Sequence, residues 1–332
     1  MPSAVRRPFA STVFSLLVLP LVLAGTALAD NAGLTPVEAR SPNAQGINDA
    51  YGWVSIFTGA IFLLVQGSLL LFIVRYRRRR RARDEDGAQV HGNTNLELAW
   101  TIAPVLILVA IGGFVFWKLP QIQDVPSANA AGGRTDVTVE GYRYYWNFEY
   151  PNGVIAVDRL RAPVGGNVRL EISAPDFEVI HSWWIPALGG KFDAIPGVVN
   201  ESWFRADAPG IYRGQCAEFC GIQHAAMLAE VEALPREEFD AWLEEEDRAQ
   251  RAGTSDLGAE TYAGACAKCH GLAGEGDIGP ALANNNLVQD AQAVETVVRN
   301  GGPKLMPPVG ADWEQRQMDA LTAYLKEGFG GE

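Results

Sequence analysis

Two long uncharged segments set the framework of this chain. They cover residues 50–74 and 98–117, and each is long enough to cross a bilayer as a helix, which takes about 20 residues. Seven arginines lie between these segments, within residues 75–83. A cluster of basic residues next to a membrane helix indicates the cytoplasmic side of the membrane. The sequence therefore predicts a transmembrane helical hairpin with both chain ends outside. A basic nucleic-acid patch is the weaker interpretation of the arginines.

An export signal is predicted ahead of the hairpin. Arg6 and Arg7 precede an uncharged run over residues 8–29, which ends in small residues. A basic start, an apolar centre and a small-residue end are typical of a signal peptide, so we expect cleavage after Ala29. An uncleaved third membrane helix is the alternative, and both interpretations leave the carboxyl-terminal bulk outside.

The pattern changes to period-two alternation between residues 135 and 234. Residues 136–140, 146–150 and 167–172 alternate apolar and polar side chains, and Gly, Pro and Asn separate them. Short alternating segments with turn residues between them are typical of half-buried strands. About a hundred residues of this kind predict an antiparallel β-sandwich.

A sulfur-rich cluster follows late in this region. Cys216, Cys220, His224 and Met227 fall within twelve residues, and His181 lies 35 residues before Cys216. Thiolate, imidazole and thioether groups favour copper over hard cations. A mononuclear blue-copper site needs one thiolate, so the second cysteine indicates two thiolates that bridge two copper ions. A disulfide, which is common in exported proteins, is the weaker alternative.

A second motif indicates a covalently bound haem. Cys266, Cys269 and His270 form the Cys-x-x-Cys-His signature of c-type haem attachment. Small cytochromes complete the iron coordination with His and Met, and Met306 lies in a loop stiffened by prolines. Met318 falls on the apolar face of a predicted carboxyl-terminal helix, so we assign it to the core.

Charge is unevenly distributed along the chain. Residues 1–118 carry 11 Lys/Arg and 7 Asp/Glu, whereas residues 119–332 carry 16 and 32. An acidic exported region argues against nucleic-acid binding. It favours a cationic protein partner, with simple solubility as an equal alternative.

With both motifs in view, the chain resembles subunit II of the haem–copper cytochrome c oxidases, of the kind with a fused cytochrome c domain. The resemblance implies a two-helix transmembrane hairpin, a cupredoxin-like antiparallel β-sandwich and a small all-α cytochrome c domain. The expected boundaries are a signal peptide at 1–29, the hairpin at 30–118, the copper domain at 119–235, a helix and linker at 236–255, and the cytochrome domain at 256–332.

The family pattern implies a binuclear copper A centre. The bridging thiolates are expected from Cys216 and Cys220, and the terminal imidazoles from His181 and His224. Met227 and the backbone carbonyl of Glu218 are expected as weak ligands. The Glu218 side chain is also implied at a magnesium site shared with subunit I, with Asp193 near the same interface. The haem c is implied on Cys266 and Cys269.

Three further positions match the family. Glu97 corresponds to a glutamate near the entrance of a proton path, with solvation of a helix end as the alternative. Tyr144 and Trp146 belong to the aromatic stretch that accepts electrons. Tyr144 stands where the family usually has the tryptophan on which external cytochrome c docks. This departure argues against docking of a soluble cytochrome there and suits a tethered haem.

The linker near residues 253–255 makes the haem-to-copper encounter intramolecular. Short flexible linkers give effective concentrations of about millimolar. We therefore expect the haem domain to bind the copper domain only briefly and then to leave again.

The resemblance implies the electron-accepting subunit of a terminal respiratory oxidase in the bacterial plasma membrane, with both metal domains on the periplasmic side. Electrons are expected to pass from the haem to the copper pair and on to subunit I, where oxygen is reduced to water with proton translocation. Three of the four histidines are assigned, and only His91 remains, so the oxygen site must lie on a partner. The expected partners are subunit I with its haem and copper B, subunit III, and a cationic cytochrome c or upstream reductase.

Two alternatives remain. A quinol oxidase subunit II shares the fold but lacks the copper ligands. A membrane-tethered copper and haem carrier, or a metallochaperone, needs no oxidase partner.

Overall fold

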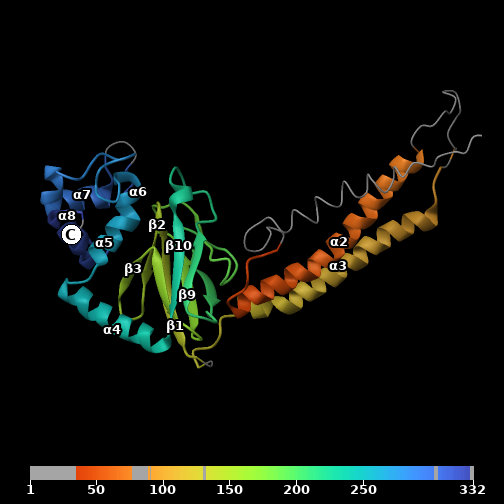
Figure 1. The fold of residues 1–332 in the computed structure, drawn as a ribbon, viewed down its shortest axis with the longest axis horizontal. Coiled ribbons are helices and arrows are strands. Elements are labelled where there is room, and N and C mark those ends of the chain that lie inside the picture. Colours follow the sequence, from red (N-terminus) through yellow and green to blue (C-terminus); the bar gives the residue numbers. More distant parts are fainter. Residues whose placement is uncertain (1–34, 77–88, 90, 130–131, 303–305, 330–332) are drawn as a thin grey trace, which may run out of the picture.

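The computed structural model describes residues 35–76, 89, 91–129, 132–302 and 306–329, and Figure 1 shows three parts along its long axis. A helical pair lies at one end, a β-sandwich in the middle and a small helical unit at the other end. The expected signal peptide and the arginines from 77 to 83 lie outside the described residues.

The helical pair consists of α2 (Pro42–Tyr76) and α3 (Thr94–Gln123), which run side by side. Both are long and apolar enough to cross a membrane, as the sequence predicts. They extend beyond the expected ranges of 50–74 and 98–117 because their outer ends continue to the sandwich. There the Ser41 hydroxyl accepts a hydrogen bond from the Arg205 amide at 3.1 Å, so the hairpin base is attached to the sandwich.

The sandwich contains a five-stranded sheet in the order β3-β2-β1-β5-β8, a three-stranded sheet β4-β10-β9 and a two-stranded ribbon β6-β7. The strands are β1 (Arg134–Tyr142), β2 (Tyr145–Glu149), β3 (Ile155–Val157), β4 (Arg159–Pro163), β5 (Asn167–Ser173), β6 (His181–Trp183), β7 (Phe192–Ala194), β8 (Asn200–Phe204), β9 (Gly210–Gln215) and β10 (Leu228–Leu234).

The sandwich prediction is confirmed, but the strands are not all antiparallel. β1 pairs with β5 and β4 pairs with β10 in parallel. Parallel neighbouring strands need a long connection. Strands β2–β4 lie in the connection from β1 to β5, and strands β5–β9 lie in the connection from β4 to β10. Alternation along the strands describes which side chains are buried, not the direction of the neighbouring strand.

The main core lies between the sheets. Phe148, Leu160, Leu170 and Val231 are at most 1% exposed there. Helix α4 (Arg236–Ala252) covers one edge, and its Phe239 packs into the same core. The helix ends at Gly253, whose left-handed φ of 68° suits glycine.

The carboxyl-terminal unit is entirely helical in the part of it that the structure describes. Its elements are α5 (Leu257–Thr261), the π-helical turn η2 (Tyr262–Cys266), α6 (Ala267–His270), η3 (Asn286–Gln289), α7 (Ala291–Asn300) and α8 (Gln315–Glu327). Asp290 caps α7 by accepting hydrogen bonds from the amides of Gln292 and Ala293. This arrangement confirms the expected small all-α domain.

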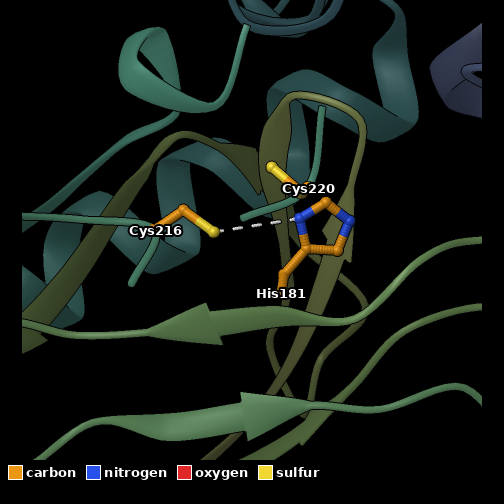
Figure 2. Close-up of side chains that lie close together, drawn as sticks. All are labelled: His181, Cys216 and Cys220. Atoms are coloured by element: carbon orange, nitrogen blue, oxygen red, sulfur yellow. Dashed lines mark hydrogen bonds between the residues drawn. The ribbon is translucent and has the colours of Figure 1, made fainter. Parts of the chain in front are cut away.

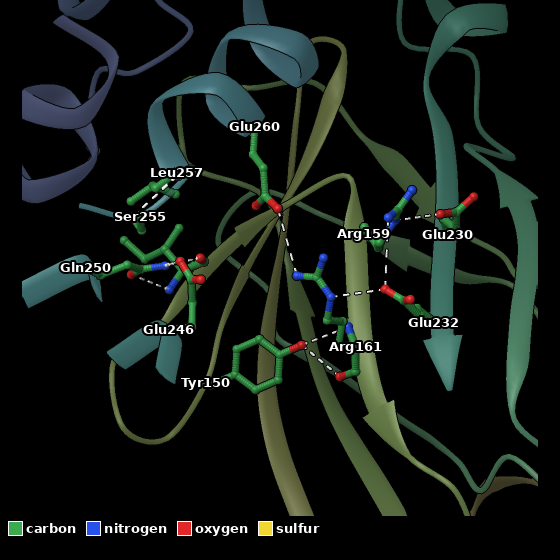
Figure 3. A network of polar contacts seen from close by, with 11 residues as sticks. Tyr150, Arg159, Arg161, Glu230, Glu232, Glu246, Gln250, Ser255, Leu257 and Glu260 are labelled. Atoms are coloured by element: carbon green, nitrogen blue, oxygen red, sulfur yellow. Dashed lines mark hydrogen bonds and ion pairs between the residues drawn. The ribbon is translucent and has the colours of Figure 1, made fainter. Parts of the chain in front are cut away.

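This helical unit packs directly on the sandwich. Tyr145 and Val157 of the sandwich share one buried core with Trp313 and Leu321 of the helical unit. Figure 3 shows polar contacts along the same side, where the side-chain amide of Gln250 exchanges hydrogen bonds with the backbone of Ile155 at 3.1 and 2.7 Å. The sequence predicts that the haem domain binds the copper domain only briefly. The structure instead shows the two domains packed together around a common buried core.

Candidate metal centres

The sulfur-rich cluster lies on the loop between β9 and β10. Its base is closed where the Cys216 amide donates to the Met227 carbonyl at 2.9 Å. The Ala217 amide donates to the Ser182 carbonyl at 2.9 Å, which fixes the loop against β6. His181 is the first residue of β6 and is fully buried. The sandwich thus brings together residues that are 35 positions apart.

Figure 2 shows His181, Cys216 and Cys220 turned toward one another. One ligand atom from each lies within 4.8 Å of the others. The Cys216 sulfur is 4.0 Å from Nδ1 of His181 and 3.2 Å from the Glu218 carbonyl oxygen. Both thiols are free, so the disulfide alternative is wrong.

The other half of the cluster gathers around Cys220. Its sulfur lies 3.6 Å from Nδ1 of His224 and 3.8 Å from the thioether sulfur of Met227. All six groups predicted from the sequence therefore meet in one place. Two thiols, two imidazoles, a thioether and a carbonyl form a donor set that suits copper, so the residues fit the implied binuclear centre.

The electrostatics of the cluster favour a thiolate. A hydrogen bond from Cys220, and a second from His181, lower the pKa of the Cys216 thiol to about 3. Burial lowers the pKa of His181, but contacts with Cys216 and Glu178 outweigh burial and leave it raised. Cys216 is therefore the first of the two cysteines to ionise, and only thiolates bind metals strongly.

A carboxylate stands behind the buried histidine. Oε2 of Glu178 lies 3.7 Å from Nε2 of His181 and accepts a hydrogen bond from Nε of Arg143 at 2.8 Å. The Glu178 side chain is 1% exposed. A carboxylate on the outer nitrogen of a metal-binding histidine orients the ring.

The helical unit contains a cavity of about 650 Å³. Cys266, Cys269, His270 and Met306 all line this cavity. Much of the remaining lining is apolar, and it includes Val294, Val298, Leu321 and Leu325. The size, the apolar lining and the presence of both His270 and Met306 in it fit a haem of the c type.

His270 is oriented for iron binding. Its Nδ1 donates to the Pro280 carbonyl at 2.8 Å, which leaves Nε2 as the free ligand atom. Gly279 passes so close that a Cβ there would lie 2.6 Å from the imidazole. Burial raises the pKa of Cys266 to about 12, in contrast to Cys216.

Tyr144 and Ile222 also line this cavity, although they belong to the sandwich domain. A Cβ on Gly221 would lie 2.5 Å from the Tyr144 hydroxyl, so this ring packs on the loop next to Cys220. Trp146 is fully buried and lies edge-on to His181, with ring centroids 6.1 Å apart.

The other predicted positions lie outside these two clusters. Glu97 is exposed near the start of α3, where it accepts a hydrogen bond from the Asn93 amide at 3.2 Å. Asp193 lies on β7 and accepts a hydrogen bond from Ser182 at 2.8 Å. The Glu218 side chain is exposed. Glu178 and Lys268 were not predicted from the sequence. Glu178 belongs to no motif, and Lys268 occupies one of the two unspecified positions of the Cys-x-x-Cys-His motif.

Three family models match the chain. Residues 29–117 match the transmembrane domain of cytochrome c oxidase subunit II, and residues 153–234 match its periplasmic domain. Residues 253–325 match subunit III of the cbb3-type cytochrome c oxidase. The three matches correspond to the three parts of the fold.

Curated relatives extend over the same regions. Cytochrome c oxidase subunit 2 of Alkalihalophilus pseudofirmus is 34% identical over 342 residues, covering 96% of each chain. The Cereibacter sphaeroides protein of that name is 33% identical over 66% of this chain and 80% of its own. The periplasmic domain of subunit II from Bradyrhizobium japonicum is 30% identical over 37% of this chain and 97% of its own, with a TM-score of 0.34.

The two apolar helices, the sulfur-rich cluster and the cavity that fits a haem define a membrane-anchored protein with a candidate copper site and a candidate haem site. The matches narrow this class. The chain belongs to the cytochrome c oxidase subunit II family and is a subunit II of a haem–copper oxidase with a fused cytochrome c domain.

Proposed function

We propose that this chain receives electrons on a covalently bound haem c and passes them through a binuclear copper centre to subunit I. One observation carries the proposal: Tyr144 lines the haem-type cavity and packs on the loop of Cys220. The two candidate metal centres therefore lie on either side of one residue. Haem and copper would supply reversible one-electron chemistry, and the protein supplies a fixed separation.

The chain's own groups would hold the copper pair in one geometry. Cys216, Cys220, His181 and His224 would hold the copper pair, with Met227 and the Glu218 carbonyl as weaker ligands. The loop is held on both sides by backbone hydrogen bonds to Met227 and Ser182. A site on a rigid scaffold changes little between oxidation states, which favours fast transfer.

The haem would be attached through Cys266 and Cys269, with His270 and Met306 on the iron. The hydrogen bond from His270 to Pro280 keeps its ring in one tautomer. A methionine thioether such as Met306 Sδ would raise the haem potential relative to other axial ligands, which suits an electron acceptor in respiration.

Carboxylates near the copper loop suit a shared magnesium. The Glu218 side chain is exposed and Asp193 is part-exposed, so both are accessible to a neighbouring subunit. We place magnesium between this chain and subunit I, and we place Glu97 at the proton-path entrance of the same partner. Oxygen reduction and proton translocation belong to subunit I, with subunit III as a further partner in the bacterial plasma membrane.

The acidic haem domain favours a basic electron donor, either a cationic cytochrome c or an upstream reductase. Oppositely charged surfaces accelerate association at low salt. Family membership argues against the free carrier and the metallochaperone, and the complete ligand set argues against a quinol oxidase.

Metal analysis with electron paramagnetic resonance on the purified full chain tests the proposal. We expect two coppers and one haem per chain and a mixed-valence copper signal. A protein that is replete with haem but takes up no copper would overturn the copper assignment and revive the quinol oxidase alternative.

A further inference from the structure

One residue of the haem attachment motif makes direct contact with the copper domain. Lys268 lies between Cys266 and Cys269, and its Nζ donates to the Tyr144 carbonyl at 2.8 Å and to Oδ2 of Asp158 at 2.6 Å. The Lys268 side chain is only 16% exposed. A lysine in this position would ordinarily extend into solvent, so its burial requires a specific partner.

Asp158 is built to receive that lysine. It lies between β3 and β4, and Oδ1 accepts a hydrogen bond from the Trp146 amide at 2.9 Å. Its own amide donates to the Trp146 carbonyl at 2.8 Å. These bonds hold a left-handed backbone with φ of 58°, which is unusual outside glycine. The carboxylate is therefore oriented before the haem domain arrives.

The copper loop contacts the same lysine from the other side. Nε2 of Gln223 donates to the Lys268 carbonyl at 2.8 Å. Gln223 lies directly before His224 and three residues after Cys220. A residue between the two haem-attachment cysteines is thus hydrogen-bonded to a residue between two copper ligands.

We propose that Lys268, through Asp158, Tyr144 and Gln223, is a positioning residue that fixes the haem edge against the copper loop. The inference rests on the proposed function. Internal electron transfer then takes place in one docked geometry, and the domain does not search for its partner on a flexible linker. The two bonds from the Lys268 ammonium are charge-assisted and therefore stronger than neutral ones. With the neutral bond from Gln223 they define both distance and orientation.

The proposal separates one electron-transfer step from its neighbours. The side-chain contacts that the structure shows for Lys268 are with Tyr144 and Asp158 of the copper domain. Loss of Lys268 should slow haem-to-copper transfer while it leaves haem reduction by an external donor, and copper oxidation by subunit I, at their original rates.

The experiment uses the full chain in its purified oxidase complex. Lys268→Met and Asp158→Asn each remove one charge, and asparagine tolerates the left-handed backbone. Photochemical injection of one electron into the haem, followed at haem and copper wavelengths, gives the internal rate. We expect each variant to lower this rate about tenfold, equivalent to about 1.4 kcal/mol of activation free energy. The double variant should be no slower than either single one, because they break the same contact.

Controls distinguish positioning from general damage. Lys326→Met, at an exposed position on α8, should leave the internal rate unchanged, and Lys268→Arg should restore most of it. Haem content and visible spectrum must match the wild type. Hydrogen exchange at β3 should increase in Lys268→Met, since the domain contact loosens.

Two failures have different meanings. An internal rate in Lys268→Met within twofold of the wild type overturns the positioning role while the proposed function stands. A wild-type complex that shows no haem-to-copper transfer at all overturns the proposed function itself.

Discussion

The Glu178 carboxylate lies 3.7 Å from Nε2 of His181, and Arg143 binds the same carboxylate oxygen at 2.8 Å. Arg143 also lines the haem-type cavity. The contacts therefore run from the cavity wall through the Arg143–Glu178 ion pair to a predicted copper ligand. At 3.7 Å the carboxylate faces Nε2 as a charge and not as a hydrogen-bond partner, and it favours the ring orientation in which Nδ1 faces the cysteines.

Glu178→Gln should weaken copper binding. The neutral amide of glutamine lacks the negative charge that faces Arg143 and His181. Substitution of a residue that contacts a metal ligand typically lowers metal affinity about 10- to 100-fold. Competition with a copper chelator measures the loss. Glu238→Gln, at an exposed position of α4, is the matched control and should bind copper normally. Equal affinities in the two variants would show that Glu178 does not orient the ligand.

Cys220→Ser should abolish the mixed-valence copper spectrum while it leaves the haem spectrum intact. Cys220 contacts both His224 and Met227, and a hydroxyl does not bridge copper as a thiolate does. Met227→Leu removes only a weak ligand, so that variant should keep two coppers. A normal mixed-valence signal in Cys220→Ser would mean that the bridging assignment is wrong.

Met306→Leu should keep the haem attached through its cysteines but lose the second axial ligand. We expect a high-spin component in the visible and paramagnetic resonance spectra and a lower reduction potential, because Met ligation raises it. Met318, fully buried in the domain core, supplies the control. Met318→Leu should retain the low-spin spectrum. A spectral change in Met318→Leu but not in Met306→Leu would mean that Met318 is the axial ligand and Met306 is not.

Tyr144→Trp tests whether the departure from the family aromatic opens a second route for electrons. The Tyr144 ring packs on Gly221 beneath the haem domain, so a tryptophan there would be covered. We expect no gain in the oxidation of added cytochrome c, measured under steady-state turnover at low salt. A strong gain would mean that external donors reach the copper domain directly.

The candidate metal ligands could be predicted because each motif is short. Cys216, Cys220, His224 and Met227 have a fixed spacing that can be recognised in the sequence alone, and so do the haem cysteines. His181 could be assigned only through the family pattern, because 35 residues, including strands β7 to β9, separate it from Cys216 along the chain. The spacing within a short motif therefore identifies the ligands that it contains. It does not show which distant residue the fold brings to the same site.

The domain contact was not predictable for the same reason. Lys268 and Asp158 are 110 residues apart, and neither belongs to a motif that specifies the other. The linker suggested a mobile tether, whereas Tyr145 and Trp313 form one continuous core across the boundary. Alternation predicted buried positions in the strands, but it could not distinguish side chains buried inside the sandwich from those buried under the helical unit.

That boundary should respond to alkaline pH. The Tyr145 hydroxyl donates to the Val309 carbonyl at 2.6 Å and accepts from Nε1 of Trp313 at 2.7 Å. Burial raises the pKa of Tyr145 well above its ordinary value, despite the opposing bond from Trp313. Burial also raises the pKa of Tyr142, which donates to Asp312 at 2.8 Å. Both tyrosines are therefore neutral when the domains are docked.

The sign of the effect follows from these shifts. Below about pH 10, the ordinary tyrosine pKa, both states are neutral and docking is at full strength. Above it the separated state ionises and the docked state does not, so docking weakens by about 1.4 kcal/mol per pH unit for each tyrosine. In the Tyr145→Phe variant the domains should dock less tightly at pH 8, since the variant loses two hydrogen bonds worth about 1 kcal/mol each. Its docking free energy should, however, decrease less than that of the wild type as the pH rises above about 10.

Hydrogen exchange at β3, corrected for the intrinsic rate, measures docking between pH 8 and pH 11 in both proteins. We expect the wild-type advantage over Tyr145→Phe to shrink above about pH 10, because only the wild type has this ionisable hydroxyl at the boundary. Tyr76→Phe, far from the contact at the end of α2, should follow the wild type. A constant difference between wild type and Tyr145→Phe across the whole range would mean that Tyr145 stays out of water when the domains part, and that the boundary does not open at this residue.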